Sequence, residues 1–172
     1  MRALPILALT LLALAACAPA APGRPSAADN LAHAHAFMAA NAGKPGVVNL
    51  PTGLQYRIIR SGPAAGVSPK GADRVAVIYE GKLTDGEVFD SSRGRPTGFA
   101  LDGVIPAFTE ALELMKPGDI WMIYAPPELA YGPDDSGPIP ANSALIFKVE
   151  LLAVLPPEGA QPAAPPGGPP TG

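Results

Sequence analysis

The chain has 172 residues, with 12 basic and 15 acidic side chains and a formal net charge of −3. This length allows one domain with appendages but is short for two full domains. Nucleic-acid binding needs clustered Lys and Arg, so this balance excludes nucleic acid as an expected partner and gives no basic surface for anionic lipid. The 23 prolines and 19 glycines gather towards the two ends, whereas residues 54–155 have the apolar spacing of a folded domain.

The first residues have the pattern of a secretory signal. Arg2 gives a short basic start, residues 3–16 are almost wholly apolar, and the run ends in Leu14-Ala15-Ala16-Cys17. A cysteine directly after Leu-Ala-Ala resembles the bacterial lipobox, in which the thiol is acylated and the chain is cut before it. We therefore expect residues 1–16 to be a lipoprotein signal peptide and Cys17 to be a lipidation site. The alternative is an ordinary signal peptide with a chance cysteine.

Lipidation at Cys17 predicts a protein of the bacterial cell envelope, lipid-anchored and either periplasm-facing or in the outer membrane. Residues 17–28 are rich in Ala, Pro and Gly and are expected to form a flexible tether. Residues 29–53 follow as a short helix and linker, with Asp29 or Asn30 as the helix cap.

That helix could pack on the domain or on a second copy of itself. An isolated helix of this length is marginal in water, which favours a monomer and leaves a dimer open. His33 and His35 stand two residues apart on it and so do not face one another, which indicates solvated side chains rather than a metal pair.

Strand patterns dominate residues 54–155. Alternation of Leu54, Tyr56 and Ile58 predicts a half-buried strand, and Asp85-Gly86 predicts a hairpin turn. Pro106 is placed to open a helix with an apolar face. The further expected strands are residues 75–80, 87–89, 99–101, 119–125 and 144–155, the last of them central, and residues 156–172 are expected to be a disordered Pro/Gly-rich tail. The predicted fold is α+β, a strongly curved antiparallel sheet (half-barrel) wrapped around one short central α-helix.

The usual catalytic sets are missing from this pattern. Both histidines lie in the N-terminal helix, and the lone cysteine is expected to be acylated. No spaced ligand cluster or phosphate-binding loop predicts a metal or other cofactor. What remains is a set of apolar and aromatic residues at element ends and in loops, beside one acidic residue, Asp90. Taken singly, each of these rings fits a core position better than a binding site.

The order of these residues resembles the signature blocks of FKBP-type peptidyl-prolyl cis-trans isomerases. The blocks are Tyr79-Glu80-Gly81 with Asp85-Gly86 and Phe89-Asp90-Ser91-Ser92, Phe99-x-Leu101 with Val104-Ile105-Pro106, Pro126 to Gly132, and Ile139-Pro140 with Leu145-Ile146-Phe147. The resemblance runs from about Val48 to Val154. Residues 46–48 and 51–56 further resemble the bacterial envelope branch that includes the macrophage infectivity potentiators. The resemblance implies an isomerase domain at residues 54–155.

The resemblance also implies a binding pocket. Its catalytic residues would be Tyr79, Asp90 and Tyr131, and its substrate-binding residues Phe89, Arg95, Phe99, Val104, Ile105, Phe108, Ile139 and Phe147. In the family's pattern the Ile105 N–H and the Tyr131 hydroxyl hold substrate carbonyls. Asp90 would bond to substrate or tune Tyr131, with Arg95 as a structural partner, although the same segment also suits a plain turn cap.

The implied function is isomerisation of X–Pro bonds to assist the folding of exported proteins, with macrolide-type inhibitors as a further class of ligand. The expected partners are proline-containing segments of exported proteins. Two departures favour an alternative, an FKBP-fold binding module or chaperone with weak or no activity. Phe108 stands where the family often has Trp, and Thr97 stands where another aromatic wall residue is common.

Overall fold

The computed structural model describes residues 25–157. Cys17, the predicted signal peptide, most of the predicted tether and most of the predicted tail lie outside the described residues. Among residues 25–157, no helix has both the length and the apolar character that a bilayer span requires.

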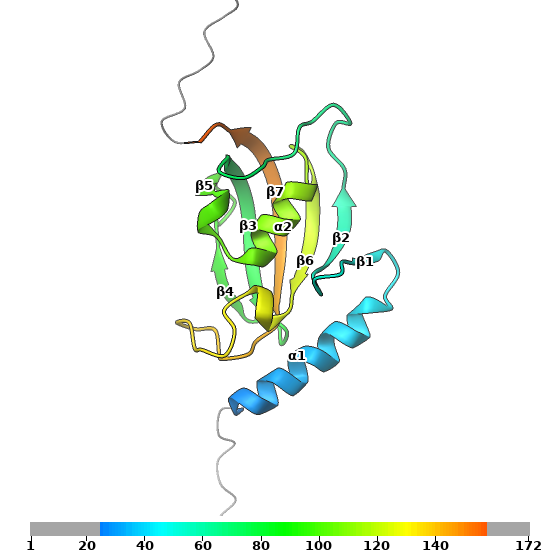
Figure 1. Cartoon of the computed structure of the whole chain (residues 1–172), viewed down its shortest axis with the longest axis vertical. Coiled ribbons are helices and arrows are strands. Elements are labelled where there is room, and N and C mark those ends of the chain that lie inside the picture. Colours follow the sequence, from blue (N-terminus) through cyan, green and yellow to red (C-terminus); the bar gives the residue numbers. More distant parts are fainter. Residues whose placement is uncertain (1–24, 158–172) are drawn as a thin grey trace, which may run out of the picture.

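A seven-stranded antiparallel sheet forms the body of the molecule (Figure 1). The strands run in the order β1-β2-β6-β7-β3-β4, and β5 also pairs with β3. Their bounds are β1 (Val47–Asn49), β2 (Gln55–Arg60), β3 (Arg74–Leu83), β4 (Val88–Ser91), β5 (Thr97–Ala100), β6 (Ile120–Ala125) and β7 (Leu145–Leu155). Long apolar β7 lies centrally, as predicted. The predicted α+β class, with a curved open sheet around a short helix, is confirmed.

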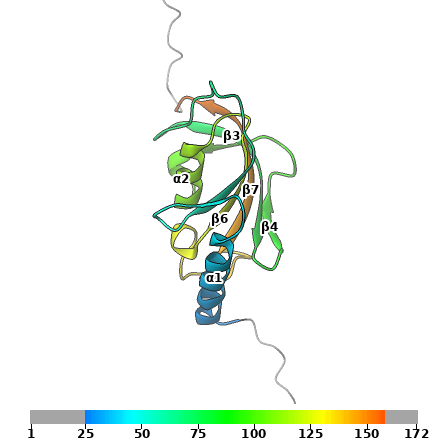
Figure 2. The same ribbon diagram turned by 90° about the vertical axis from the view of Figure 1, so that its right-hand side faces the viewer.

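Helix α2 (Pro106–Leu114) packs in the concave side of the sheet (Figure 2). Pro106 takes the first helical position, where its missing N–H is not needed, and Ile105 is the N-cap. Ala107, Phe108, Ala111 and Leu112 of α2 are buried against the sheet, in a core that also includes Leu54, Val75, Val77, Ile123, Leu145, Phe147, Val149 and Leu151. This packing places one ring of α2, Phe108, inside the curve of the sheet.

The turn chemistry follows the sequence in some places and not in others. Gly86 has φ +96 in the predicted hairpin, and its N–H donates to the Leu83 carbonyl over 3.1 Å. The strand expected at residues 99–101 instead ends at Ala100. Leu101 is fully buried and begins a short 3₁₀ turn, η1 (Leu101–Gly103), that leads into α2.

Helix α1 (Ala27–Ala42) begins earlier than the sequence suggested and takes in the last two residues of the predicted tether. The cap is Ser26, not Asp29 or Asn30. The Asp29 N–H donates to Ser26 Oγ over 3.1 Å, and the Ser26 N–H donates to the Asp29 carboxylate over 3.1 Å. These reciprocal bonds form a capping box. The Asp29 carboxylate also accepts from Ser26 Oγ over 2.7 Å, and this bond, followed by the one from the Ser26 N–H, lowers the pKa of Asp29.

The predicted alternation along β2 is wrong at two positions. Ile58 is 47% exposed, whereas Gln55 is buried. The physical reason is α1, which packs near the start of β2 and supplies partners for an amide. Gln55 Nε2 donates to the Met38 carbonyl over 2.9 Å, and Gln55 Oε1 accepts from Asn41 Nδ2 over 2.9 Å. Ile58 lies on the opposite face of β2 from Gln55, opposite Trp121 of β6, so α1 gives it no cover.

Candidate active site

A cavity of about 390 Å³ opens between α2, the concave face of the sheet and the loops beside them. Strands β7, β3 and β4 are neighbours in the sheet, and each contributes a ring. Residues from η1 and α2 form the opposite side, and Tyr131 comes from the loop after the 3₁₀ turn η2 (Pro127–Leu129). The lining residues are Tyr79, Phe89, Asp90, Phe99, Gly103, Val104, Ile105, Phe108, Tyr131 and Phe147.

The cavity's rings pack mainly edge to face. The buried ring of Phe108 lies 4.7 Å from that of Phe147, at an interplanar angle of 77°. It also meets Tyr79 at 6.2 Å and 86°, and Phe89 meets Phe147 at 5.6 Å and 89°. This arrangement sets the positive edge of one ring against the negative face of the next, which fixes their positions relative to each other. The result is an apolar, preformed wall around Phe108.

Gly81 explains how two of these rings approach each other. It lies on β3 opposite Asp90 of β4 and Phe147 of β7. A Cβ atom there would come within 2.6 Å of Phe89 Cζ and 2.9 Å of Phe147 Cε1, so the rings occupy the space of the missing side chain. The sequence analysis quoted Gly81 within a signature block but gave it no role, because the ring contacts come from strands distant in sequence.

A short hydrogen bond lies at the rim. Tyr79 Oη donates to Asp90 Oδ2 over 2.6 Å. Burial, followed by this bond and the Asp90 charge, raises the pKa of Tyr79 to about 12. Tyr79 is therefore a neutral donor at physiological pH. The expectation that Asp90 tunes Tyr131 is not what the structure shows, since the phenol bonded to Asp90 belongs to Tyr79.

Two polar groups at the cavity remain available for a ligand. Within residues 25–157, neither the Ile105 N–H nor the Tyr131 hydroxyl takes part in a hydrogen bond. Ile105 is half-buried and Tyr131 is 41% exposed. Two free donors in the lining of an apolar cavity can hold the carbonyl groups of an extended peptide.

Two of the predicted pocket residues do not line the cavity. Arg95 is exposed in the turn after β4, and its N–H donates to the Ser92 carbonyl rather than its side chain meeting Asp90. Ile139 is buried in the core, and its N–H donates to the Ser136 carbonyl. Gly103 joins the lining instead. Thr97 lies on β5 outside the lining.

Comparison with known proteins places these features in a family. A sequence profile described as "FKBP-type peptidyl-prolyl cis-trans isomerase" matches residues 66–152. The chain belongs to that family. A second profile, "Domain amino terminal to FKBP-type peptidyl-prolyl isomerase", matches residues 17–58. The cavity rings of this FKBP-type chain therefore lie within the matched isomerase segment.

Two of the relatives are bacterial proteins of greater length than this chain. "Outer membrane protein MIP" of Legionella longbeachae is 49% identical over 131 residues, which is 74% of this chain and 55% of the relative. "Peptidyl-prolyl cis-trans isomerase Mip" of Coxiella burnetii is 52% identical over 128 residues, 73% of this chain and 55% of the relative. The chain spans about half the length of these curated relatives.

Solved structures share the fold. The crystal structure of FkpA from Escherichia coli has a TM-score of 0.72 and 46% identity, covering 76% of this chain and 61% of that one. The peptidyl-prolyl cis-trans isomerase of Pseudomonas syringae pv. tomato also has a TM-score of 0.72, with 36% identity over 77% of this chain and 98% of that one.

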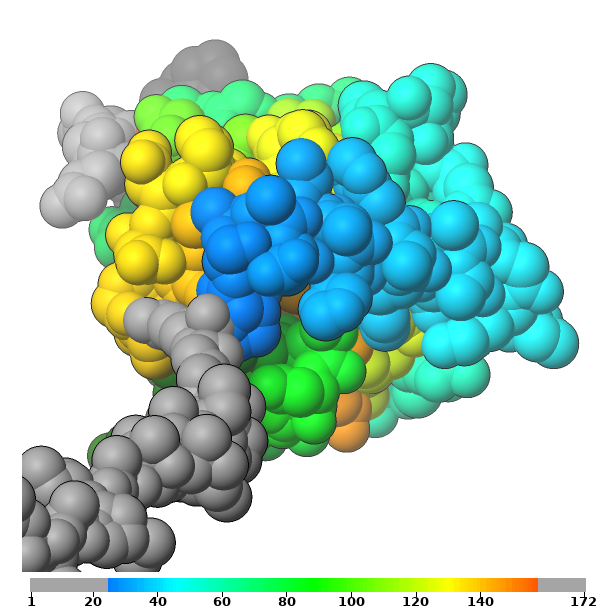
Figure 3. Space-filling view, turned by 90° about the horizontal axis from the view of Figure 1, so that it is seen from below, coloured from blue at the N-terminus to red at the C-terminus, as the bar shows by residue number. Residues whose placement is uncertain are grey.

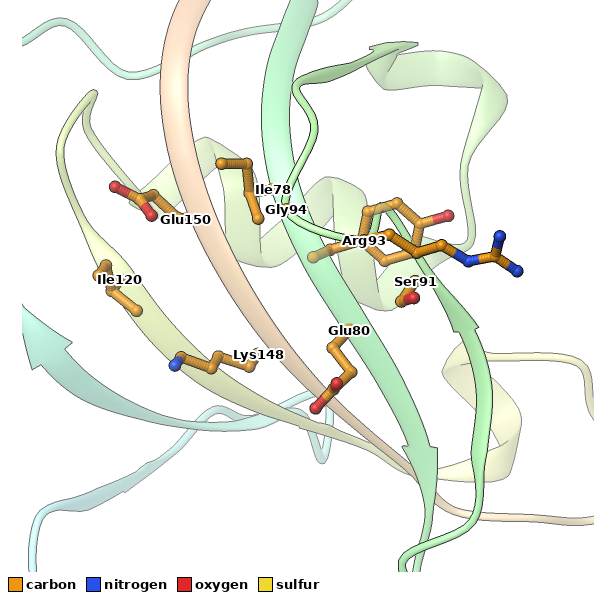
Figure 4. Close-up of a pocket in the computed structure, with 9 residues that line it drawn as sticks. Ile78, Glu80, Ser91, Arg93, Gly94, Ile120, Lys148 and Glu150 are labelled. Atoms are coloured by element: carbon orange, nitrogen blue, oxygen red, sulfur yellow. The ribbon is translucent and has the colours of Figure 1, made fainter.

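A second hollow of about 250 Å³ lies on the other face of the sheet of this FKBP-type domain (Figure 4). Successive strand residues point to opposite faces, so Ile78 and Glu80 lie here while the ring of Tyr79 faces α2. Four of its nine lining residues are charged, and two of these four are already paired. Glu80 meets Lys82 at 2.8 Å, and Glu150 meets Arg60 at 2.7 Å. The ring-lined cavity is therefore the better candidate site.

Proposed function

We propose that this chain is a peptidyl-prolyl cis-trans isomerase that acts on proline-containing segments of exported proteins and binds the X–Pro bond in the ring-lined cavity. The observation that carries this proposal is the position of the cavity. An apolar cavity of packed rings, with two free hydrogen-bonding groups, lies inside the segment that matches the isomerase family.

The chemistry needs no nucleophile. Rotation about an X–Pro bond is slow because amide resonance has to be broken, and uncatalysed exchange takes tens to hundreds of seconds. The twisted transition state has less charge separation than either planar form, so it is the less polar species. An apolar cavity that excludes water binds that state better than the planar states, and this difference lowers the barrier.

Each side chain then has a limited task. Phe108 and Phe147 form the floor under the proline ring, with Tyr79, Phe89 and Phe99 as walls. The Ile105 N–H and the Tyr131 hydroxyl hold the flanking carbonyls.

Asp90 supports the reaction rather than performing it. Its carboxylate fixes the hydroxyl of Tyr79 over 2.6 Å and so keeps that wall in place. Arg95 and Ile139 have no direct contact with substrate in this proposal, because neither lines the cavity.

The test measures isomerisation of short X–Pro peptides by NMR exchange, for the full chain and two tyrosine variants. Tyr131→Phe removes a hydroxyl at the cavity and should lower kcat/KM by about two- to tenfold, the effect of one neutral hydrogen bond. Tyr56→Phe is the matched control, because Tyr56 stacks on Trp121 at 4.2 Å, away from the cavity, and should leave kcat/KM unchanged.

A parent chain without catalysis would refute the enzyme assignment. If such a chain still bound proline peptides, and Phe108→Trp restored turnover, the protein would instead be a binding module with an altered floor.

We further propose that the protein is anchored in the bacterial cell envelope through acylated Cys17 and that macrolide-type inhibitors occupy the same cavity. Support for the location comes from the lipobox-like sequence and from the Legionella relative, which carries the name of an outer membrane protein. Metabolic labelling with a palmitate analogue should mark the parent chain and not Cys17→Ser. Equal labelling of both would refute the anchor.

Sedimentation over a concentration series tests the favoured monomer against a dimer.

A further inference from the structure

Helix α1 lies beside the loop that carries Tyr131. Figure 3 shows α1 in blue along the underside of the molecule, with the loop of residues 126–144 in yellow at its flank. This loop runs from the end of β6 to the start of β7 and contributes Tyr131 to the lining of the cavity. The position of Tyr131 therefore depends on what holds the loop.

Asn142 connects α1 to the neighbour of Tyr131 in two hydrogen bonds. Asn142 Nδ2 donates to the Ala27 carbonyl in the first turn of α1, over 3.0 Å. The Asn142 N–H donates to the Gly132 carbonyl over 2.7 Å. One residue thus bonds to the helix with its side chain and to the Tyr131 segment with its backbone.

The backbone of Asn142 is suited to this double contact. Its φ is +58, a left-handed conformation that costs most residues energy and that Gly, Asn and Asp tolerate best. Glycine would satisfy the backbone but has no side chain to reach α1. Asparagine supplies both the conformation and the donor.

Further contacts join the same two parts. Asn30 Nδ2 on α1 donates to the Ala141 carbonyl over 2.9 Å, and the Ala141 N–H donates to Asp135 Oδ1 over 2.7 Å, within the loop. Ala34 of α1 is buried with Ala144 at the loop's end. The pair of His35 and Glu128, at 3.5 Å with both side chains about 60% exposed, adds little.

We propose that α1 orders the Tyr131 loop of the cavity, and that Asn142, assisted by Asn30, is the positioning residue that transmits this order. The inference rests on the proposed function for its effect on catalysis. It assigns the N-terminal helix a role at the active site without any contact between the helix and substrate.

The test changes the side chain of Asn142 in the full chain. Asn142→Asp keeps the size of the side chain and tolerates the left-handed backbone, but a carboxylate cannot donate to the Ala27 carbonyl. Asn142→Gly keeps the backbone conformation and removes the side chain without adding charge. The matched control is Asn49→Asp, because Asn49 Nδ2 donates to the Ala42 carbonyl over 3.2 Å at the other end of α1.

Two readouts separate positioning from general stability. In both Asn142 variants, amide hydrogen exchange at Gly132 and at residue 142 should be faster by about fivefold or more. Both variants should also have a higher KM, with kcat/KM lower by about fivefold. Asn49→Asp should change neither quantity. Circular dichroism checks that α1 remains folded in each variant.

Unchanged exchange in both Asn142 variants would overturn the inference, and so would faster exchange with unaltered kcat/KM. An equal effect of Asn49→Asp would show that any loosening of α1 suffices, which also overturns the role of Asn142. If the parent chain has no activity, the proposed function fails, while the exchange rates still decide whether α1 orders the loop.

Discussion

Gly81 is a strand position at which one added carbon atom disturbs the cavity from two sides. In Gly81→Ala the new methyl would stand 2.6 Å from Phe89 Cζ and 2.9 Å from Phe147 Cε1. Ordinary carbon contacts are about 3.5 to 4.0 Å, so the rings have to retreat by roughly 1 Å. Phe89 is half-buried and can yield outward, but Phe147 is 4% exposed and already packs on Phe108.

Overpacking of this kind costs about 1–3 kcal/mol. Alanine also reduces the conformational entropy of the unfolded chain, which stabilises the folded state by about 0.4–1 kcal/mol and offsets part of this cost. We therefore expect Gly81→Ala to lower the free energy of unfolding by about 1–2 kcal/mol, as measured by urea denaturation. Because Phe89 and Phe147 both line the cavity, kcat/KM for an X–Pro peptide should also fall by about tenfold, or about 1.4 kcal/mol.

Gly98→Ala is the control, since the nearest heavy atoms to its new methyl, Val75 O and Arg74 Nη2, lie at 3.9 and 4.0 Å. That variant should match or slightly exceed the parent in stability and retain its activity. A Gly81→Ala protein with the parent's denaturation midpoint and kcat/KM would refute the reasoning, because it would show that ring positions at the cavity adjust without cost.

Three further predictions concern single side chains. The pKa of Tyr79 is raised to about 12 in the folded state, so the stability that this phenol contributes is complete below its unfolded pKa of about 10 and is lost as pH rises through about 12. Urea unfolding of Tyr79→Phe should accordingly show a shallower fall between pH 10 and 12, and a fall as steep as the parent's would contradict this. Asp90→Asn retains an oxygen that can accept from Tyr79, so kcat/KM should fall by less than about tenfold, and complete loss of activity would mean that the carboxylate takes part in the reaction itself. Gln55→Leu removes the buried amide that donates to the Met38 carbonyl and should lower the free energy of unfolding by about 1–3 kcal/mol. A denaturation midpoint equal to the parent's would contradict this.

The sequence predicted those features that depend on neighbours in the chain. Asp85-Gly86 marks a hairpin because Gly86 supplies a positive φ within two residues of the strand ends. Pro106 marks the start of α2 because its ring suits the first helical position. The cap at Ser26 was also within reach, since Ser26-Ala-Ala-Asp29 has the spacing of a capping box with Asp in place of Glu.

Features that depend on distant partners could not be predicted in this way. Gln55 is buried because α1 supplies a carbonyl and an amide for its side chain, and nothing in the local alternation shows this. Asn142 gives no local sign that it bonds to Ala27, 115 residues away in the chain. The cavity rings were found only through the resemblance to a family, because each ring alone is more typical of a core than of a binding site.

Phe108 bears on whether this chain needs the tryptophan that the family often has. Its ring is 4% exposed and lies edge-on to Phe147 at 4.7 Å and to Tyr79 at 6.2 Å, so the floor is filled by contacts with two other lining residues. A larger ring at this place would either displace one of them, at a cost of about 1–3 kcal/mol for overpacking, or extend into the cavity and reduce the space for a ligand. The smaller floor is thus matched to its surroundings, and a matched apolar floor is what preferential binding of a twisted amide requires. On these grounds Phe108 is consistent with an active isomerase of altered ligand preference and gives no reason to expect a module that has lost catalysis.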